Sequence, residues 1–257
     1  MSSHPVRRHS PPAARPDSAL VIFAKAPIPG QVKTRLCPPL THDEAATLQG
    51  SFVLDALERT NAAVAKFKLP LARYLACAPS SALPFFKIME ARQAVSLVDQ
   101  IGADLGERMH AAFETMFGRG YRKVVLVGTD VPTVPLDYYR DALSLLRDHD
   151  AVFGPALDGG YYLVGLTKPA PDLFAGVPWS TDRVLAVTRD IADRLGLRTA
   201  LLPEWRDVDT IDDLRDLIAA ALTDSQRPAQ SRQFSSRTAG VLQLLAKRLP
   251  SRHNSGQ

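Results

Sequence analysis

The chain has few cysteines, since only Cys37 and Cys77 carry a thiol among its 257 residues. They lie far apart in the sequence, with no second pair beside either of them. This spacing excludes a zinc-binding cysteine framework and a disulfide-rich scaffold. We therefore expect a protein that works in a reducing cytosol.

Long apolar runs are also missing. Nowhere do about eighteen apolar residues follow one another, so the sequence predicts no transmembrane helix. Residues 1–17 carry basic side chains but are too rich in Pro and Ser to form the apolar centre of a signal peptide. Their composition predicts a disordered leader. Together these two absences predict a soluble, cytoplasmic protein.

A basic face for nucleic acid is missing too, although the isoelectric point is about 9.2. Residues 1–17 carry a net charge of +2 and residues 224–257 carry +5, which leaves −3 for residues 18–223. A mildly acidic folded part offers no basic stripe for a phosphate backbone, so we expect no nucleic-acid partner. Residues 18–223 are expected to form one domain, and residues 224–257 a basic, mostly disordered tail with a short helix at 241–249.

What is present is an alternation of short apolar runs and helix-like stretches, which predicts an α/β fold with a mostly parallel sheet. The most informative run is 124–132, VVLVGTDVP. Four apolar residues in a row are typical of a strand that is covered on both faces, and ligands in open α/β sheets bind at the carboxyl ends of such strands. Asp130 stands at that end. The alternative is that Asp130 opens the turn before Pro132.

The loop after the first predicted strand is rich in cations. It spans residues 25–36, and Pro27, Pro29 and Gly30 shape its backbone. In an extended segment Lys33 and Arg35 would point the same way, and Arg can hold phosphate oxygens with two hydrogen bonds. The loop is therefore a candidate anion cradle. The alternative is a solvated basic loop, because the sequence lacks the P-loop motif.

Two further segments combine glycine with polar side chains. Residues 100–109 couple a turn with Gly102 to a predicted helix; alternatively, Asp104 caps that helix and Arg108 is merely exposed. Residues 151–166, AVFGPALDGGYYLVGL, read as two strands around Asp158. This pattern is also typical of a simple hairpin, but the tyrosines that follow suggest a wall for a flat or sugar-like ligand. Trp179 is either a core residue or a stacking face.

The last candidate segment is acidic and spans residues 204–214. Asp207 and Asp209 would share a face of an extended chain, and two carboxylates on one side suit a hard divalent cation. Thr210 is a candidate helix cap. The alternative is that these acids only favour the helix dipole, which explains Asp207 less well than the acids inside the helix.

Six ordered motifs, taken together, resemble one family. They are the segments 25–36, 100–109, 128–132, 154–162, 179–181 and 207–210. They are similar to the domain-of-unknown-function family 2064, a bacterial group of glycosyltransferase-like proteins related to nucleotide-diphospho-sugar transferases. The resemblance covers about residues 19–222 and implies a GT-A fold, a Rossmann-like three-layer α/β/α sandwich that binds a nucleotide over the ends of its parallel strands.

The resemblance implies a role for each matching residue. Asp130 and Asp209, with Asp207 beside them, are implied to bind Mg²⁺ or Mn²⁺, and Asp158 and Lys33 are implied to be catalytic. The implied nucleotide-binding residues are Lys25, Gly30, Lys33, Arg35, Gln100, Gly102 and Arg108. The implied acceptor side consists of Gly159, Gly160, Tyr161, Trp179 and Thr181.

The type of reaction stays open at this point. The Asp-x-Asp of many glycosyltransferases is absent, since residues 128–130 read Gly-Thr-Asp. The resemblance implies sugar transfer from a nucleotide-diphospho-sugar to a small acceptor. The alternatives are nucleotidyl transfer, which releases pyrophosphate, and a catalytically silent nucleotide-binding module.

Overall fold

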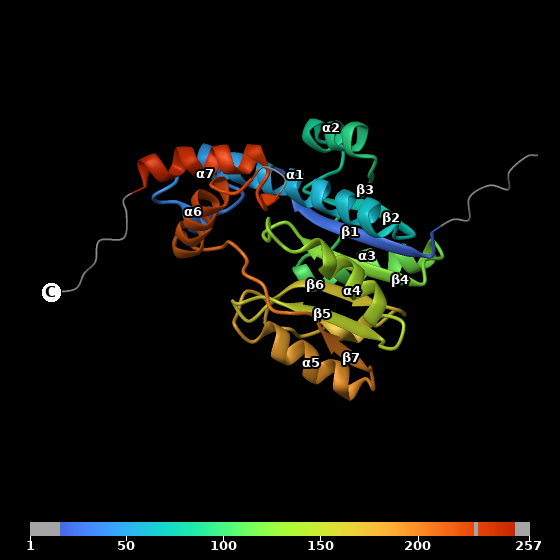
Figure 1. Ribbon diagram of the computed structural model, residues 1–257. Coiled ribbons are helices and arrows are strands. Elements are labelled where there is room, and N and C mark those ends of the chain that lie inside the picture. Colours follow the sequence, from blue (N-terminus) through green and yellow to red (C-terminus); the bar gives the residue numbers. More distant parts are fainter. Residues whose placement is uncertain (1–15, 229–230, 250–257) are drawn as a thin grey trace, which may run out of the picture.

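A computed structural model describes residues 16–228 and 231–249, which are built around one sheet of seven strands in the order β3-β2-β1-β4-β6-β5-β7 (Figure 1). The strands are β1 (Ser18–Lys25), β2 (Leu71–Ala78), β3 (Ser96–Asp99), β4 (Lys123–Gly128), β5 (Ala151–Pro155), β6 (Tyr161–Leu166) and β7 (Thr199–Leu201).

The sheet is mostly parallel. Strand β1 pairs in parallel with β2 and β4, β2 with β3, and β5 with β7, whereas β6 runs antiparallel to both of its neighbours. The apolar run of β4 is buried from Val124 to Val127. The predicted α/β fold with a mostly parallel sheet is confirmed, and the carboxyl ends of β1 and β4 lie side by side.

Helices cover both faces of the sheet, which gives the expected three layers (Figure 1). One face and its helices share a hydrophobic cluster, and these helices are α1 (His42–Phe67), α2 (Pro84–Gln93) and α4 (Leu136–Leu145). The opposite face shares a second cluster with α3 (Leu105–Gly118), the short 3₁₀ helix η2 (Pro171–Phe174) and α5 (Val184–Arg194).

Side chains at the helix starts explain where the helices begin. Thr41 and Glu44 form a capping box at the start of α1, in which the Glu44 N–H donates to Thr41 Oγ1 over 3.2 Å. Thr210 and Asp213 form an equivalent box at the start of α6 (Ile211–Ser225). The cap at Thr210 fixes where the acidic segment ends and the helix begins.

The region after residue 223 differs from the expected mostly disordered tail. Helix α7 (Ser236–Arg248) is longer than the predicted short helix, and it lies beside α1 and α6 (Figure 1). Its apolar face, with Leu242 and Leu245, joins a third hydrophobic cluster with α1 and α6. Burial of that face offsets the cost of ordering the segment.

A buried carboxylate anchors α7. Asp55 of α1 is 3% exposed and accepts hydrogen bonds from Ser235 Oγ at 2.6 Å, from Arg237 Nη2 at 3.0 Å and from the Thr238 hydroxyl. Burial raises the pKa of Asp55 from its ordinary value. The predicted leader, residues 1–17, lies almost wholly outside the described residues. None of the helices in the described residues is long and apolar enough to cross a membrane.

Candidate active site at the carboxyl ends of the strands

A cavity of about 720 Å³ opens at the carboxyl ends of β1 and β4. It collects residues from every segment that the sequence singles out. The predicted site residues that line it are Lys25, Lys33, Arg35, Gln100, Asp130, Asp158, Gly160, Tyr161, Trp179, Thr181, Asp207 and Asp209. Ligands in open α/β sheets bind at this position, so this cavity is the candidate active site.

The first loop is folded differently from the extended segment we expect. Residues Thr34–Leu36 form a short 3₁₀ helix, η1, and Lys33 before it is left-handed, with φ 50° and ψ 34°. Lys33 and Arg35 therefore do not share a face through strand geometry. Nevertheless, both side chains line the cavity, because the turn redirects them towards it.

Lys33 is held by the segments opposite the loop. Its side chain is 3% exposed, and its Nζ lies 2.6 Å from Asp130 Oδ1 and donates to the Val208 carbonyl over 2.6 Å. The ammonium also lies 5.5 Å from the centre of the Phe52 ring. A buried charge needs such partners. The predicted phosphate-binding cation thus contacts the predicted metal-binding carboxylate.

Arg35 also pairs with a carboxylate, but at the surface. Its Nη1 lies 2.5 Å from Asp209 Oδ2, and both side chains are exposed to solvent. Such an exposed pair is screened and adds little stability. Both cations of the first loop are therefore paired with carboxylates that face the same cavity.

Several carboxylates lie close together where the acidic segment meets the end of β4 and the β5–β6 hairpin. Burial, followed by the charges of Asp158, Asp213 and Asp130, raises the pKa of Asp207 to about 6. An all-oxygen donor set in such a negative field fits a hard divalent cation. However, no group of three or more His, Cys, Asp or Glu side chains in residues 16–228 and 231–249 is arranged to hold a metal ion.

The β5–β6 hairpin carries Asp158 to the cavity. Asp158 Oδ1 accepts from the Gly160 N–H over 2.8 Å, and the Gly159 carbonyl accepts from the Leu185 N–H over 2.9 Å. Gly159 has φ 86°, and a Cβ there would lie 2.1 Å from the Asp182 carbonyl oxygen. Only glycine allows this approach. The segment is thus both a hairpin and part of the cavity.

Trp179 combines the two roles that the sequence leaves open. Its ring lines the cavity and also packs against α3, where a Cβ on Gly106 would lie 2.9 Å from it. Tyr161 meets Trp179 edge to face, with ring centres 6.4 Å apart. Burial raises the pKa of Tyr161, whose ring belongs to the core. Trp179 is therefore the aromatic wall, supported from behind by Tyr161.

Known proteins place the chain in a family. A family model described as "Uncharacterized protein conserved in bacteria (DUF2064)" matches residues 61–181. A crystal structure of a candidate nucleotide-diphospho-sugar transferase from Desulfovibrio desulfuricans G20 is 35% identical, with 90% of this chain and 96% of that chain covered and a TM-score of 0.76. The chain belongs to the DUF2064 family.

The fold of this DUF2064 protein extends to more distant enzymes. The structure of a CMP:2-keto-3-deoxy-manno-octonic acid synthetase complexed with CTP has a TM-score of 0.50 at 12% identity, and 80% of this chain and 99% of that chain are covered. This likeness shows the fold alone. A search of the curated proteins found no match.

Four predicted site residues of the DUF2064 chain do not line the cavity, namely Gly30, Gly102, Arg108 and Gly159. Arg108 is turned away, because its Nε donates to the Gly102 carbonyl over 3.0 Å and so stabilises the turn before α3. Gln100 lines the cavity, but its Nε2 donates to the Ala24 and Ala76 carbonyls at 3.1 and 2.9 Å. Gln100 therefore ties β1 and β2 together.

Gln49 is a polar residue of the cavity that the sequence did not single out. Gln49 of α1 is 3% exposed and lines the cavity, and its Nε2 lies 3.4 Å from the Lys25 carbonyl and 3.3 Å from Thr129 Oγ1. It connects the ends of β1 and β4. The available signal was a glutamine on the apolar face of a predicted helix, where buried polar groups need partners.

Proposed function

We propose that this DUF2064 protein transfers a sugar from a nucleotide-diphospho-sugar to a small acceptor, in a reaction that depends on Mg²⁺ or Mn²⁺. The observation that carries the proposal is the meeting of Lys33 and Arg35 with Asp130 and Asp209 in one cavity. A diphosphate together with a divalent cation offers partners of opposite charge to both sets. The 35% identity to a candidate nucleotide-diphospho-sugar transferase supports the same substrate class.

The cations of the first loop would bind the diphosphate. Lys25, Lys33 and Arg35 all line the cavity next to the end of β1. We infer that Lys33 and Arg35 exchange their carboxylate partners for phosphate oxygens when the substrate enters. Charge on the leaving nucleoside diphosphate grows as the sugar departs, and fixed cations stabilise that charge most.

The carboxylates opposite the loop would hold the divalent cation. Asp130, Asp207 and Asp209 would supply oxygen ligands. Burial, and after it the charges of neighbouring carboxylates, raises the pKa of Asp207, and a bound cation would offset the repulsion among these carboxylates. When bound, the ion supplies positive charge next to the diphosphate. Because the pKa of Asp207 is about 6, Asp207 is mostly ionised, and so able to bind a cation, above that pH.

The acceptor would lie on the side of the β5–β6 hairpin. Asp158 faces the cavity, and its carboxylate is well suited to take the proton from an attacking hydroxyl. Trp179 offers a flat apolar surface of the kind that packs against sugar rings, and Gly160 and Thr181 line the cavity near it.

One observation favours nucleotidyl transfer as a second candidate. The end of β4 carries a single acidic residue, Asp130, after Gly128 and Thr129, whereas many glycosyltransferases carry two acids at this place. In this alternative an acceptor phosphate attacks the α-phosphate of a nucleoside triphosphate, and pyrophosphate leaves.

Product analysis tests the proposal. Purified protein is incubated with panels of nucleotide-sugars and nucleoside triphosphates plus acceptors, with and without Mn²⁺. We expect a nucleoside diphosphate from a nucleotide-sugar only when the metal is present, and loss of this product in Asp158→Asn. Asp193→Asn, on the exposed side of α5, is the matched control. Release of pyrophosphate would favour the second candidate, and no turnover with tight nucleotide binding would contradict both.

A further inference from the structure

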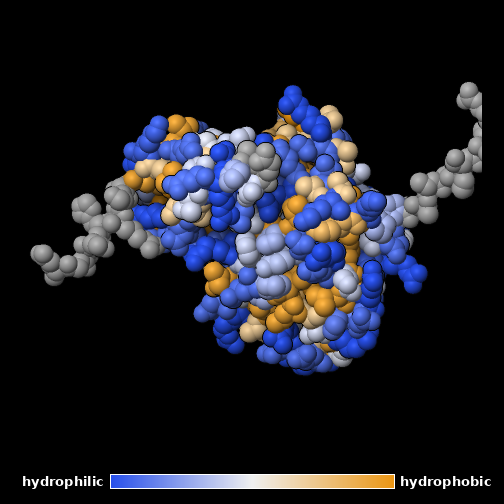
Figure 2. Space-filling model, in the orientation of Figure 1, coloured by the Kyte–Doolittle hydropathy of each residue, from blue (hydrophilic) through white to orange (hydrophobic). Residues whose placement is uncertain are grey.

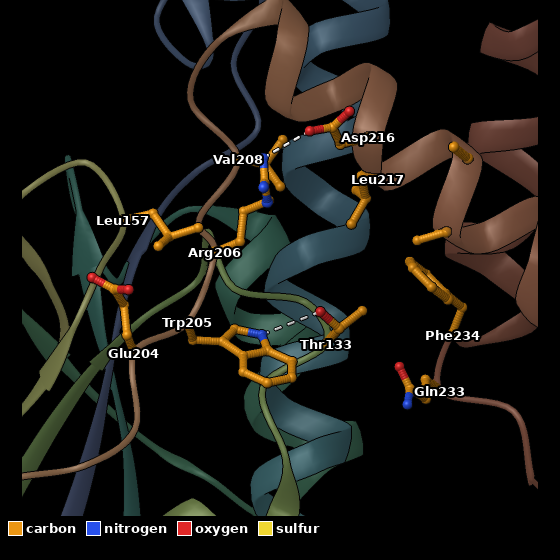
Figure 3. Close-up of a pocket in the computed structure, with 12 residues that line it drawn as sticks. Thr133, Leu157, Glu204, Trp205, Arg206, Val208, Asp216, Leu217, Gln233 and Phe234 are labelled. Atoms are coloured by element: carbon orange, nitrogen blue, oxygen red, sulfur yellow. Dashed lines mark hydrogen bonds and ion pairs between the residues drawn. The ribbon is translucent and has the colours of Figure 1, made fainter.

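A second cavity lies behind the segment that carries Asp207 and Asp209. Its volume is about 520 Å³, and it is lined by Glu204, Trp205, Arg206 and Val208, by residues of α6, and by Gln233 and Phe234 before α7 (Figure 3). This volume is within the range of small-molecule sites. Nothing in the proposed transfer reaction uses this cavity.

The two cavities share a wall in which neighbouring residues face opposite ways. Asp207 and Asp209 line the candidate active site, whereas Arg206 and Val208, which alternate with them along the chain, line the second cavity. Side chains of residues 206–209 therefore point alternately to the two cavities, as in an extended chain. In the turn between β5 and β6, Asp158 lines the active site and Leu157 lines the second cavity. The second cavity is therefore distinct from the active site, although it is adjacent to it.

Hydrogen bonds fix this wall. The backbone N–H of Trp205 donates to the Pro155 carbonyl over 3.0 Å, and the backbone N–H of Leu157 donates to the Trp205 carbonyl over 3.3 Å. The Val208 N–H donates to the Asp130 carbonyl over 3.0 Å, and the Val208 carbonyl accepts from Lys33. The cavity is thus formed before any ligand arrives, which lowers the entropic cost of binding.

The shape and lining of the cavity favour a flat apolar molecule. Trp205 lies on one side and Phe234 on the other, with Leu217 between them (Figure 3). Trp205 Nε1 donates to Thr133 Oγ1 over 3.3 Å, which orients the indole ring. Leu157 is 50% exposed at the same end as Glu204, so it offers apolar surface that a ligand can cover.

The charges of the lining favour a cation. Arg206 is occupied, because its Nη1 lies 2.8 Å from Asp216 Oδ2. Glu204 is exposed, and no hydrogen bond or ion pair joins it to the other residues drawn in Figure 3. The ionised lining residues, Glu204, Arg206 and Asp216, sum to −1. A ligand with an ammonium group complements this charge, whereas a carboxylate does not.

We propose that the second cavity binds a small planar aromatic amine, with its ring between Trp205 and Phe234 and its ammonium near Glu204. The proposal is independent of the transfer reaction and stands or falls on binding alone. Face contacts with the Trp205 ring would also favour a cationic ligand.

Calorimetry with two probes of the same ring and opposite charge tests the proposal. We expect the full-length protein, without nucleotide, to bind tryptamine about three- to fivefold more tightly than indole-3-acetate, which corresponds to a partly exposed charge contact of up to about 1 kcal/mol. Glu204→Gln is expected to remove most of this difference while neutral indole binds as before. Equal affinity for the two probes, or no binding of tryptamine at millimolar concentration, would overturn the proposal.

A filled cavity tests the location. Ala220 lies exposed on α6 and lines the cavity, so Ala220→Trp is expected to abolish tryptamine binding. Ala62→Trp, at an exposed position of α1 outside the cavity, is the matched control and is expected to bind normally. Thermal unfolding checks both folds, and Ala219→Trp replaces Ala220→Trp if the latter melts early. Unchanged binding in a folded, filled variant would overturn the assignment.

Discussion

Lys33 Nζ lies 2.6 Å from Asp130 Oδ1, although the two residues are separated by almost a hundred positions in the chain. The loop after β1 and the end of β4 are therefore joined directly through opposite charges. Lys33 is almost wholly buried, whereas Asp130 is half exposed on the cavity side. A substrate can reach the carboxylate, but the ammonium is available to it only after a local rearrangement.

The first prediction concerns this pair. Asp130→Asn keeps the size of the side chain but removes its negative charge, so the buried ammonium keeps only neutral acceptors, namely the new amide oxygen and the Val208 carbonyl. We expect a loss of about 1–3 kcal/mol in the free energy of unfolding, together with loss of the stabilisation by nucleotide and Mg²⁺ in thermal unfolding. Asp130→Asn combined with Lys33→Met should recover much of the stability but not the ligand effect. An unchanged ligand effect in Asp130→Asn would limit Asp130 to its pairing with Lys33 and would contradict a role in ligand binding.

The second prediction concerns Arg35. Arg35→Ala removes an exposed pair with Asp209, so the free energy of unfolding should change by less than about 1 kcal/mol. Binding of a nucleoside diphosphate should weaken about ten- to a hundredfold, because a charge-assisted phosphate contact contributes about 1.5–3 kcal/mol. Calorimetry with a nucleoside, its monophosphate and its diphosphate measures this. The nucleoside serves as the control, and an equal loss for all three ligands would contradict a phosphate contact.

The sequence was sufficient to place the strand-end residues in one cavity. Parallel strands bring their carboxyl ends to one edge, so apolar runs followed by polar residues predict which side chains meet there. Asp130 and Asp158 follow from that rule, although one belongs to a parallel strand and the other to a hairpin. Which partner each side chain then contacts is decided by tertiary packing.

Three features could not be predicted for this reason. Lys33 adopts a left-handed backbone that its residue type does not favour, so the extended loop in the sequence-based interpretation was wrong. The Arg108 side chain donates to the Gly102 carbonyl of the turn before α3 and so does not reach the cavity. Helix α7 is ordered by contacts with α1 residues almost two hundred positions earlier, of which Asp55 is the buried polar one.

Hydrophilic residues cover most of the face seen in Figure 2, and apolar residues gather on it in patches.

The third prediction uses α7. Leu242 is 1% exposed in the cluster with α1 and α6, so Leu242→Ala should lower the free energy of unfolding by about 2–4 kcal/mol. Leu244→Ala is the matched control on the same helix, because Leu244 is 68% exposed and should cost less than about 0.5 kcal/mol. Urea unfolding of both variants measures the difference. Equal stabilities would mean that α7 is detached from the domain in solution.

The fourth prediction concerns the pH dependence of stability. The pKa of Asp207 is about 6 in the folded protein, above its ordinary value, so ionisation of Asp207 disfavours the folded state. Its contribution to stability is present below about pH 4 and is lost as the pH rises through 6. At pH 7–8 the free energy of unfolding of Asp207→Asn should therefore exceed that of the wild type by about 1–2 kcal/mol, a value reduced because Asp207 is partly exposed. At low pH the two free energies should become equal.

Chemical denaturation at several pH values measures this difference without any substrate. Asp193→Asn serves as the control because Asp193 is exposed on α5, and it should follow the wild type at every pH. A constant difference between Asp207→Asn and the wild type from pH 4 to 8 would contradict the raised pKa. A smaller difference when Mg²⁺ is added would support cation binding by ionised Asp207.

The last prediction concerns the glycine that positions Asp158. Gly159 has φ 86°, and a Cβ there would meet the backbone of Asp182 at 2.1 Å, so Gly159→Ala combines backbone strain with a clash that only movement of the hairpin can relieve. Gly176→Ala separates the two effects, because Gly176 has φ 70° but open space around its Cβ position. Gly176→Ala should cost only about 1 kcal/mol, or about 2–4 °C in melting temperature. Gly159→Ala should lose more than that, and a folded fraction should still have lost product formation because Asp158 moves with the hairpin. Equal melting temperatures and equal turnover in the two variants would show that the hairpin does not depend on its close approach to Asp182.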